Sequence, residues 1–475
     1  MIKDRRTTAH TKRSICRIVL SFILLYVISG ALTACGKGSD LALDKKNPKE
    51  ITVWYTFSDK RAAAFEKMIN EFNEGEGLER GIIVKGTAFD TEKALLKEYE
   101  ETKELPNMLG INSTCSLLYD KKITYVDINS LVASNTKSDI CKEYIKAGTI
   151  NKEWRLFPVL KDTPVMAINL VMWQPFMNSE EKYLNELETW ENCSSTGTSY
   201  YEFTGGQSLL AIDSEADYML AGCHQLDADI LNIEGSNTVI RTEGNAMKKL
   251  WENYYVSFVK GAYYKYNSSC LDDIKESTVA GAVLKSSLVS ELSDRIATEG
   301  DADPAGAYSV LPCPQFNGYD KICLADDSGV AIVDKDETED FASMLFLEWL
   351  TGDEVNLKFA CLSGAMPVNK NDKNIDKLEK AMEKLDMTDI EKETMRVVVQ
   401  TMNDGSLYAP PLSEYYSDLR KTLEGAMSRE ALNDRNSVES SVYIGEDQEK
   451  AVSKFTSDDH FSSFLMDFKN RLPKP

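Results

Sequence analysis

Short runs of strand-forming residues alternate with amphipathic helix patterns between residues 50 and 112, and this alternation limits the possible folds more than any other feature. The strand patterns lie at residues 50–55, 81–86 and 107–112. The helix patterns lie at 58–73, with Ser58 as expected N-cap, and at 91–104; the first places Phe65, Met68, Ile69 and Phe72 on one face. Strand–helix–strand–helix–strand at this spacing predicts a parallel sheet with right-handed crossovers. Ligands of such sheets bind at the carboxyl ends of the strands, here residues 54–57, 89–90 and 112–114.

The rest of the chain continues this mixture of helices and strands. Further strands are expected at 164–171, 322–324 and 329–333. Helices are expected at 113–122, 215–226, 244–255, 337–350, 373–385, 389–402 and 413–431, and a Gly/Ser/Thr-rich turn region at 194–206.

The first 34 residues have the pattern of an export signal. Six basic residues precede an uncharged run at 18–32, which is shorter than the ~20 residues that a membrane-spanning helix needs. Leu32-Thr-Ala-Cys35 then resembles a bacterial lipobox, in which the cysteine is lipidated and the chain is cut before it. An uncleaved anchor with a chance cysteine is the alternative. We expect a signal peptide at 1–34, then lipidated Cys35 and a polar tether up to residue 49, with the body outside the cytoplasm at the membrane.

The net charge of −22 excludes whole classes of partner. Nucleic acid requires a basic surface that displaces counterions, and the chain offers none. The signal segment holds six basic residues and one acidic residue, so the remaining chain is more acidic still. This argues against an anionic solute unless a local basic pocket exists. We expect no metal and no cofactor.

The cysteines form no recognisable framework. Cys313 and Cys323 flank the turn-like Asn317-Gly318, so either a hairpin disulfide or two free thiols fits the sequence. Other cysteines, such as Cys115 and Cys361, read as small buried hydrophobic residues.

Several motifs, in order, resemble the carbohydrate-type extracellular solute-binding lipoproteins of ABC importers (family 1). The early ones are the lipobox, ITVWY at 51–55, INEFN at 69–73, PNMLGI at 106–111 and VMAIN at 165–169. The late ones are YSVLPCP at 308–314, DSGVAIV at 327–333, FLEWLT at 346–351 and SGAMPV at 363–368. No single motif is specific, but their order extends over nearly the whole chain after Cys35.

The resemblance implies an α/β, two-lobed fold of the periplasmic-binding-protein type (type II) with a hinge between the lobes. Lobe 1 would comprise 50–160 plus 325–370, and lobe 2 would comprise 161–324 plus 371–475 with the C-terminal helices. The implied function is capture of a small polar solute, a sugar or oligosaccharide first, between closing lobes. The partners would be that solute, an ABC permease and, through the lipid, the membrane; we expect a monomer that is not an enzyme.

Sugar sites stack aromatic rings on the apolar faces of the sugar and add polar groups for its hydroxyls. We expect stacking from Trp54, Tyr55 and Phe57 at the end of the first strand, and from Trp173, Trp190 and Trp251 in lobe 2; the alternative for each is packing in the core. Polar contacts are expected from Asn112, Ser113, Thr114, Asp327 and Ser328, with helix capping or turn formation as the alternative.

Two departures from the family pattern weaken the carbohydrate expectation. The usual aromatic residues before Asn169 are replaced by Met-Ala-Ile, and a Gly-Pro-Trp-like element appears as Gly-Ala-Val-Leu at 281–284. The competing functions are a secreted glycoside-acting enzyme and a lipid-tethered scaffold without a small ligand. The sequence contains no catalytic motif such as HExxH or GxSxG, and its many acidic residues would supply a carboxylate pair by chance.

Overall fold

A computed structural model describes residues 43–57, 59–265, 269–292 and 307–475. Residues 44–475 form one compact unit. The predicted signal segment, Cys35 and the predicted cap Ser58 lie outside the described residues.

The first sheet contains the predicted strand–helix–strand–helix–strand unit. Its strand order is β14-β3-β1-β2, in which β1 runs parallel to both β2 and β3, and β14 joins β3 in antiparallel orientation. The strands are β1 (Lys49–Tyr55), β2 (Ile82–Ala88), β3 (Met108–Asn112) and β14 (Ser328–Ile332). The predicted helical face is confirmed, because Phe65, Met68, Ile69 and Phe72 are buried on α2 (Asp59–Glu74).

The second sheet has the strand order β10-β7-β11-β6-β12. Its strands are β6 (Pro164–Asn169), β7 (Leu210–Ile212), β10 (Tyr263–Tyr264), β11 (Gly281–Lys285) and β12 (Tyr308–Pro312). β7 runs parallel to β10 and β11, whereas β6 is antiparallel to both β11 and β12. A large apolar core lies around this sheet and reaches the C-terminal helices through residues such as Phe464 and Phe468.

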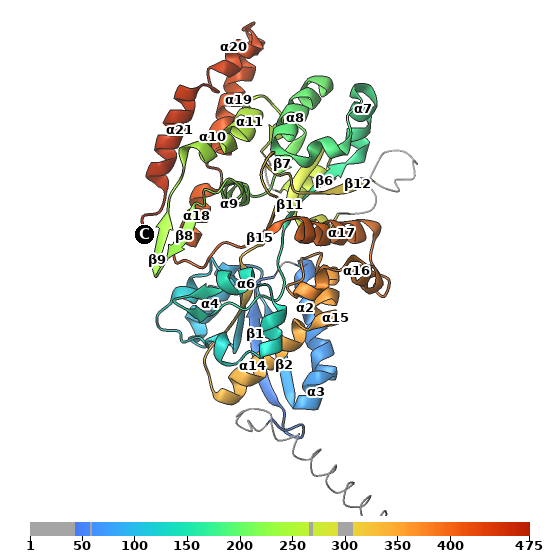
Figure 1. Cartoon of the computed structure of the whole chain (residues 1–475), viewed down its shortest axis with the longest axis vertical. Coiled ribbons are helices and arrows are strands. Elements are labelled where there is room, and N and C mark those ends of the chain that lie inside the picture. Colours follow the sequence, from blue (N-terminus) through green and yellow to red (C-terminus); the bar gives the residue numbers. More distant parts are fainter. Residues whose placement is uncertain (1–42, 58, 266–268, 293–306) are drawn as a thin grey trace, which may run out of the picture. The chain divides into compact units, whose positions relative to one another are not determined.

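Helices surround both sheets (Figure 1). Around the first sheet lie α2, α3 (Glu76–Arg80), α4 (Glu92–Thr102), α5 (Ser134–Asp139), α6 (Lys142–Ala147), α14 (Glu337–Leu350), α15 (Asp353–Ser363) and α16 (Ile375–Met382). Around the second lie α7 (Leu170–Glu180), α8 (Trp190–Thr204), α9 (Glu215–Gln225), α10 (Gly244–Asn253), α11 (Tyr255–Val259), α12 (Cys270–Lys275), α13 (Ser286–Val289) and α17 (Asp389–Asp404). The chain ends in α18 (Tyr416–Leu423), α19 (Ser428–Tyr443), α20 (Gln448–Ser453) and α21 (Asp458–Arg471).

Three small sheets supplement the two main ones. The paired strands β4 (Thr149–Ile150) and β5 (Glu153–Trp154), β8 (Leu231–Glu234) and β9 (Asn237–Ile240), and β13 (Ile322–Leu324) and β15 (Ser406–Tyr408) form three small sheets. The chain passes from one main sheet to the other at 160–163, between β5 and β6, and back at 325–327, between β13 and β14. Gly329 lies at this crossing, where an added Cβ would come within 2.8 Å of the Phe157 carbonyl oxygen, so a larger residue would push the segments apart.

The structure corrects three of the local predictions. Only a 3₁₀ turn (Ser116–Tyr119) forms within 113–122. Residues 194–206 belong mainly to helix α8, because buried Trp190, Cys193 and Tyr200 anchor one of its faces despite poor helix propensity. The helix expected at 413–431 is divided into α18 and α19 at Gly425, which has a positive φ of 70°.

All eight cysteines from Cys115 onward are free thiols, so the hairpin disulfide between Cys313 and Cys323 does not form in this structure. Within the described residues, the helices are too short or too polar to cross a bilayer.

Candidate functional site

Three adjoining cavities share Lys285 in their linings, and the first of them is lined by residues from both parts of the fold. The first, about 420 Å³, is lined by the ends of β1 and β2, the start of α2, Asn112, Lys285, Ser287 and Leu288. The second, about 450 Å³, is lined by Asp213, Ser214, Lys265, Lys285, Arg420, Glu424, Gly425 and Arg429. The third is a recess of about 40 Å³ beneath Asp213 and Ser214. We call these three together the central cleft.

The central cleft forms where strands end. Phe57 lies just after β1, and Asn112 is the last residue of β3. Asp213 follows β7, and Lys285 is the last residue of β11. Side chains at strand ends leave the sheet and so become available to a ligand.

A buried ionic junction lies beside the cleft. Arg61, on α2, places Nη2 2.5 Å from Oδ2 of Asp162 and Nη1 3.8 Å from Oδ2 of Asp326. The Asp162 carboxylate also accepts hydrogen bonds from both hydroxyls and one amide of Ser286 and Ser287, at 3.0–3.1 Å. Because Arg61 belongs to the first sheet's helices and the serines to α13, one carboxylate links both parts of the fold.

The charges of this junction are mutually compensated. Burial alone would raise the pKa of Asp326, but the cations of Lys161, Arg61 and Lys285 hold that pKa below its usual range. Nζ of Lys161 donates to the backbone carbonyls of Asp326 (2.9 Å) and Ser328. The Asp326 carboxylate therefore remains ionised at neutral pH.

Basic side chains dominate the second cavity. Four of its eight lining residues are cationic (Lys265, Lys285, Arg420 and Arg429), against two carboxylates (Asp213 and Glu424). The guanidinium of Arg420 already binds other side chains of the protein, because its Nη1 donates to Asp217 at 2.6 Å and its Nη2 to Ser214 at 3.2 Å. Lys285 is half-buried, and burial alone would lower its pKa. The carboxylates of four aspartates around the cleft have the larger effect and raise the pKa overall, with Asp326 and Asp217 contributing most. Lys285 therefore stays protonated and offers N–H donors to whatever enters.

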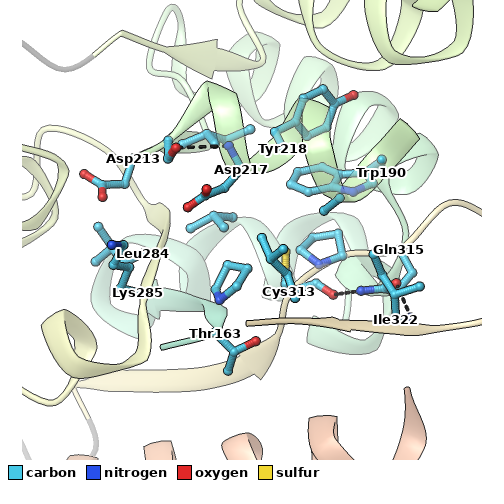
Figure 2. Close-up of a pocket in the computed structure, with 18 of the residues that line it drawn as sticks. Thr163, Trp190, Asp213, Asp217, Tyr218, Leu284, Lys285, Cys313, Gln315 and Ile322 are labelled. Atoms are coloured by element: carbon cyan, nitrogen blue, oxygen red, sulfur yellow. Dashed lines mark hydrogen bonds between the residues drawn. The ribbon is translucent and has the colours of Figure 1, made fainter. Parts of the chain in front are cut away.

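The recess is apolar at one end and charged at the other. Figure 2 shows Trp190 and Tyr218 on one side, Lys285 on the other, and Asp217 pointing inward between them. At about 40 Å³ it has room for a water molecule or a small substituent, but not for a sugar ring. It is therefore an extension of the cleft and not a separate solute site.

The structure places most of the predicted stacking residues in hydrophobic cores. Tyr55, Trp173 and Trp251 are at most 1% exposed, because alternate strand positions and inward helix faces carry them away from the cleft. Trp54 packs edge-on against Phe89, with ring centroids 5.3 Å apart, and does not line the cleft. Phe57 does line it, under the Arg61 guanidinium at 5.8 Å from the ring centroid.

Of the predicted polar residues, one lines the cleft and the others do not. Asn112 is exposed and lines the cleft. Ser113 and Asp327 bind each other, with Oγ donating to Oδ2 at 2.7 Å, and buried Ser328 bonds to Asp326 at 2.8 Å, so all three act in the turn. Thr114 is half-buried and lines none of the three cavities. Of the predicted set, Phe57 and Asn112 line the first cavity, and Trp190, which is 5% exposed, lines the recess.

Sequence reasoning missed the charged half of the cleft. Lys285 follows the Gly-Ala-Val-Leu segment in which the family pattern is broken, and that departure was the one signal in the sequence. Asp162, Arg420 and Arg429 lie in segments with no strand-end signal, so their approach to the cleft depends on tertiary structure.

Two sheets of this topology with a polar cleft between them define a class, the two-lobed α/β binding proteins. The structure is similar to the cyclic alpha-maltosyl-1,6-maltose binding protein from Arthrobacter globiformis (TM-score 0.63, 15% identity, covering 89% of this chain and 100% of that one). It is also similar to UgpB from Mycobacterium tuberculosis (0.61, 14%, 89% and 99%) and to MalE from Xanthomonas citri (0.61, 13%, 89% and 99%). These likenesses confirm the predicted α/β two-lobed fold.

The family is shown by the sequence itself. The model of the bacterial extracellular solute-binding proteins matches residues 67–385, and the chain belongs to that family. No curated protein matches it in sequence.

Proposed function

We propose that this protein is the lipid-anchored, extracytoplasmic solute-binding component of an ABC importer. It captures a small polar solute, a carbohydrate first, in the central cleft and delivers it to a permease. Family membership supports binding of a solute outside the cytoplasm. The similar structures include proteins described as binding a cyclic maltosyl-maltose and, for UgpB, a complex with glycerophosphocholine, so both a neutral sugar and a phosphodiester are reasonable first probes.

The observation that carries the proposal is the composition of the cleft. The walls of its first cavity come from both main sheets, and the cavities together supply donors and acceptors that include Lys285, Asp213 and Asn112. Groups of this kind suit a solute with many hydroxyl or phosphate oxygens. Closure of the two lobes on such a solute would complete its contacts and give the permease a state to recognise.

Lys285→Ala is expected to weaken solute binding by tenfold or more, because it removes the cation common to all three cavities. A thermal-shift screen with neutral oligosaccharides and glycerophosphodiesters selects the solute, and calorimetry then compares wild type and variant. Lys275→Ala, which removes an exposed lysine outside the cleft, is the matched control and should bind as the wild type does.

The same screen tests the competing functions. Turnover of a glycoside would identify an enzyme, and the absence of any ligand from a broad library would favour a tethered scaffold. Unchanged affinity in Lys285→Ala would contradict the cleft assignment while leaving solute binding intact.

Lipid anchoring has its own test. Cys35→Ala should move the protein from the membrane fraction to the soluble fraction, since the thioether-linked lipid is the proposed anchor. Fractionation with immunoblotting measures this. Retention of the variant in the membrane with an uncut signal segment would show that the apolar run at 18–32 is the anchor instead.

A further inference from the structure

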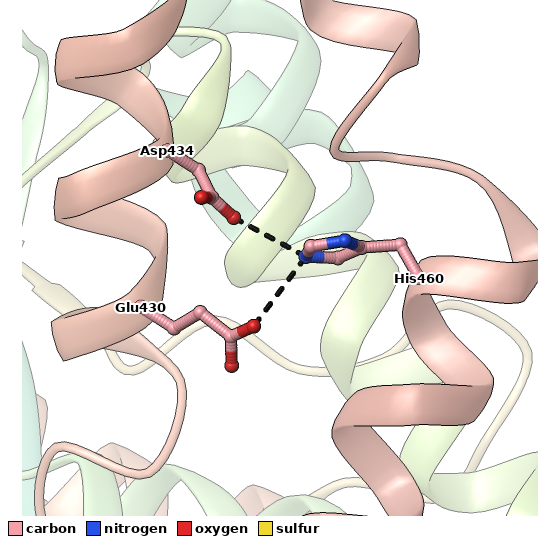
Figure 3. Close-up of side chains that lie close together, drawn as sticks. All are labelled: Glu430, Asp434 and His460. Atoms are coloured by element: carbon pink, nitrogen blue, oxygen red, sulfur yellow. Dashed lines mark ion pairs between the residues drawn. The ribbon is translucent and has the colours of Figure 1, made fainter.

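Three metal-ligating side chains meet between two C-terminal helices, well separated in sequence from the cleft residues of β1 to β3. Glu430 and Asp434 stand one turn apart on α19, and His460 lies in the first turn of α21. Nε2 of His460 is 3.2 Å from Oδ2 of Asp434 and 3.6 Å from Oε1 of Glu430. Figure 3 shows both carboxylates directed at this one nitrogen from the facing helix.

These separations match the edges of a tetrahedral zinc site. Zinc binds histidine nitrogen and carboxylate oxygen at about 2.0–2.2 Å, so two ligand atoms of a tetrahedron lie roughly 3.3–3.6 Å apart. The measured 3.2 Å and 3.6 Å are close to that spacing, and all three ligand atoms lie within 4.8 Å of one another. The Tyr255 hydroxyl, 2.7 Å from Nε2, is at hydrogen-bond distance and closer than an edge of the tetrahedron, so a water would complete the four ligands.

The histidine is held in position by its surroundings. Its ring packs against three aromatic rings, those of Tyr255, Phe455 and Trp251, with centroids 5.6 Å, 6.0 Å and 6.4 Å away. The Tyr255 hydroxyl also donates to Asp434 and so orients that carboxylate. Fixed ligands of this kind reduce the entropy lost when a metal binds.

The local charge favours a dication. Glu430 and Asp434 supply two formal negative charges, and their side chains are 45% and 14% exposed. The ligand atoms of the two carboxylates lie within 4.8 Å of each other, so their like charges repel. A divalent cation would relieve this repulsion.

We propose that Glu430, Asp434 and His460 form a binding site for Zn²⁺ that clamps α21 to α19. The site has one nitrogen and two oxygen ligands, and none of its three residues lines the central cleft, although Glu430 directly follows the cleft residue Arg429. It would stabilise the C-terminal helices in the presence of zinc.

The two histidines after Cys35 make a direct test possible. His224 is an internal control, because its Nδ1 pairs at 2.8 Å with one carboxylate, Asp229, and its ring stacks on Tyr408. In residues 36–475, proton NMR should show the imidazole signals of His460 shifting or broadening up to about one equivalent of ZnCl₂, while those of His224 remain in place. Zinc should also raise the melting temperature.

Glu430→Gln is the decisive variant, since Glu430 is the most exposed of the three side chains and its loss should not unfold the protein. It should melt as the wild type does without zinc but bind zinc about 10–100-fold more weakly. His224→Ala should leave zinc affinity unchanged. The proposal fails if the His460 signals stay in place, if both histidines respond in parallel, or if Glu430→Gln binds zinc as tightly as the wild type. Zinc uptake by the free cysteines would leave His460 unmoved and would count against the site.

Discussion

Replacing Arg61 with methionine should lower the free energy of unfolding by about 3–5 kcal/mol, because it removes one partner of a buried ion pair and leaves the other charged. Asp162 is 5% exposed and has Arg61 as its ion-pair partner at 2.5 Å. The hydrogen bonds from Ser286 and Ser287 would remain, but they do not neutralise a carboxylate. Urea denaturation followed by fluorescence measures the change.

The double variant Arg61→Met/Asp162→Asn separates the ion pair from the packing of the arginine. An asparagine is neutral and keeps an acceptor for the serines, so the double variant should recover part of the lost stability. If the loss of unfolding free energy in the double variant equals the sum of the losses in Arg61→Met and Asp162→Asn, the two residues are not coupled and the ionic junction contributes little.

Glu215→Ala should lower the free energy of unfolding by about 2–4 kcal/mol, because two buried amides lose their hydrogen-bond acceptor. Glu215 opens α9 and is 2% exposed; its carboxylate accepts from the backbone amides of Met427 and, at 3.2 Å, Ser428, where α19 begins. It thus caps one helix from the start of another. Glu243, exposed before α10 and without a side-chain capping bond, provides the matched control, and Glu243→Ala should change stability by less than about 0.5 kcal/mol.

The contribution of Glu215 should depend on pH in a defined direction. Burial raises its pKa from 4.5 to about 6, with the two amide hydrogen bonds opposing the shift. Between those pH values the folded protein binds more protons than the unfolded chain, so the contribution increases as pH falls from 7 to below 4.5, by about 2 kcal/mol. The difference in unfolding free energy between wild type and Glu215→Ala should widen accordingly; a difference independent of pH would contradict the raised pKa.

The fold was predictable where one physical signal dominated. In β1 and α2 the apolar period matches the buried face, so their bounds were found to within a few residues. The prediction failed for α8, where seven Ser, Thr and Gly residues suggested turns while three buried anchors decided the outcome. Local propensity is worth a fraction of a kcal/mol per residue, and burial of a large side chain is worth more.

The site was only partly predictable for a different reason. The strand-end rule led to Phe57 and Asn112, but the same rule could not tell which face of β1 would be covered by helices, and Tyr55 turned inward against Phe65. The cations Arg420 and Arg429 come from the C-terminal segment, which no sequence pattern connects to β7 or β11. Their position depends on how distant parts of the chain pack together.

The antiparallel strand β14 has a consequence for how the protein comes to be folded. Its partner β3 ends at Asn112, but β14 begins only at Ser328. The amide and carbonyl groups along one edge of β3 therefore lack their hydrogen-bond partners until more than two hundred further residues have been synthesised. A chain in which β14 has not yet been synthesised would therefore carry an open sheet edge of the kind that recruits other strands. The first sheet cannot be completed before the chain has been synthesised as far as Ile332. Until then the incomplete protein is prone to aggregate with other chains through this sheet edge.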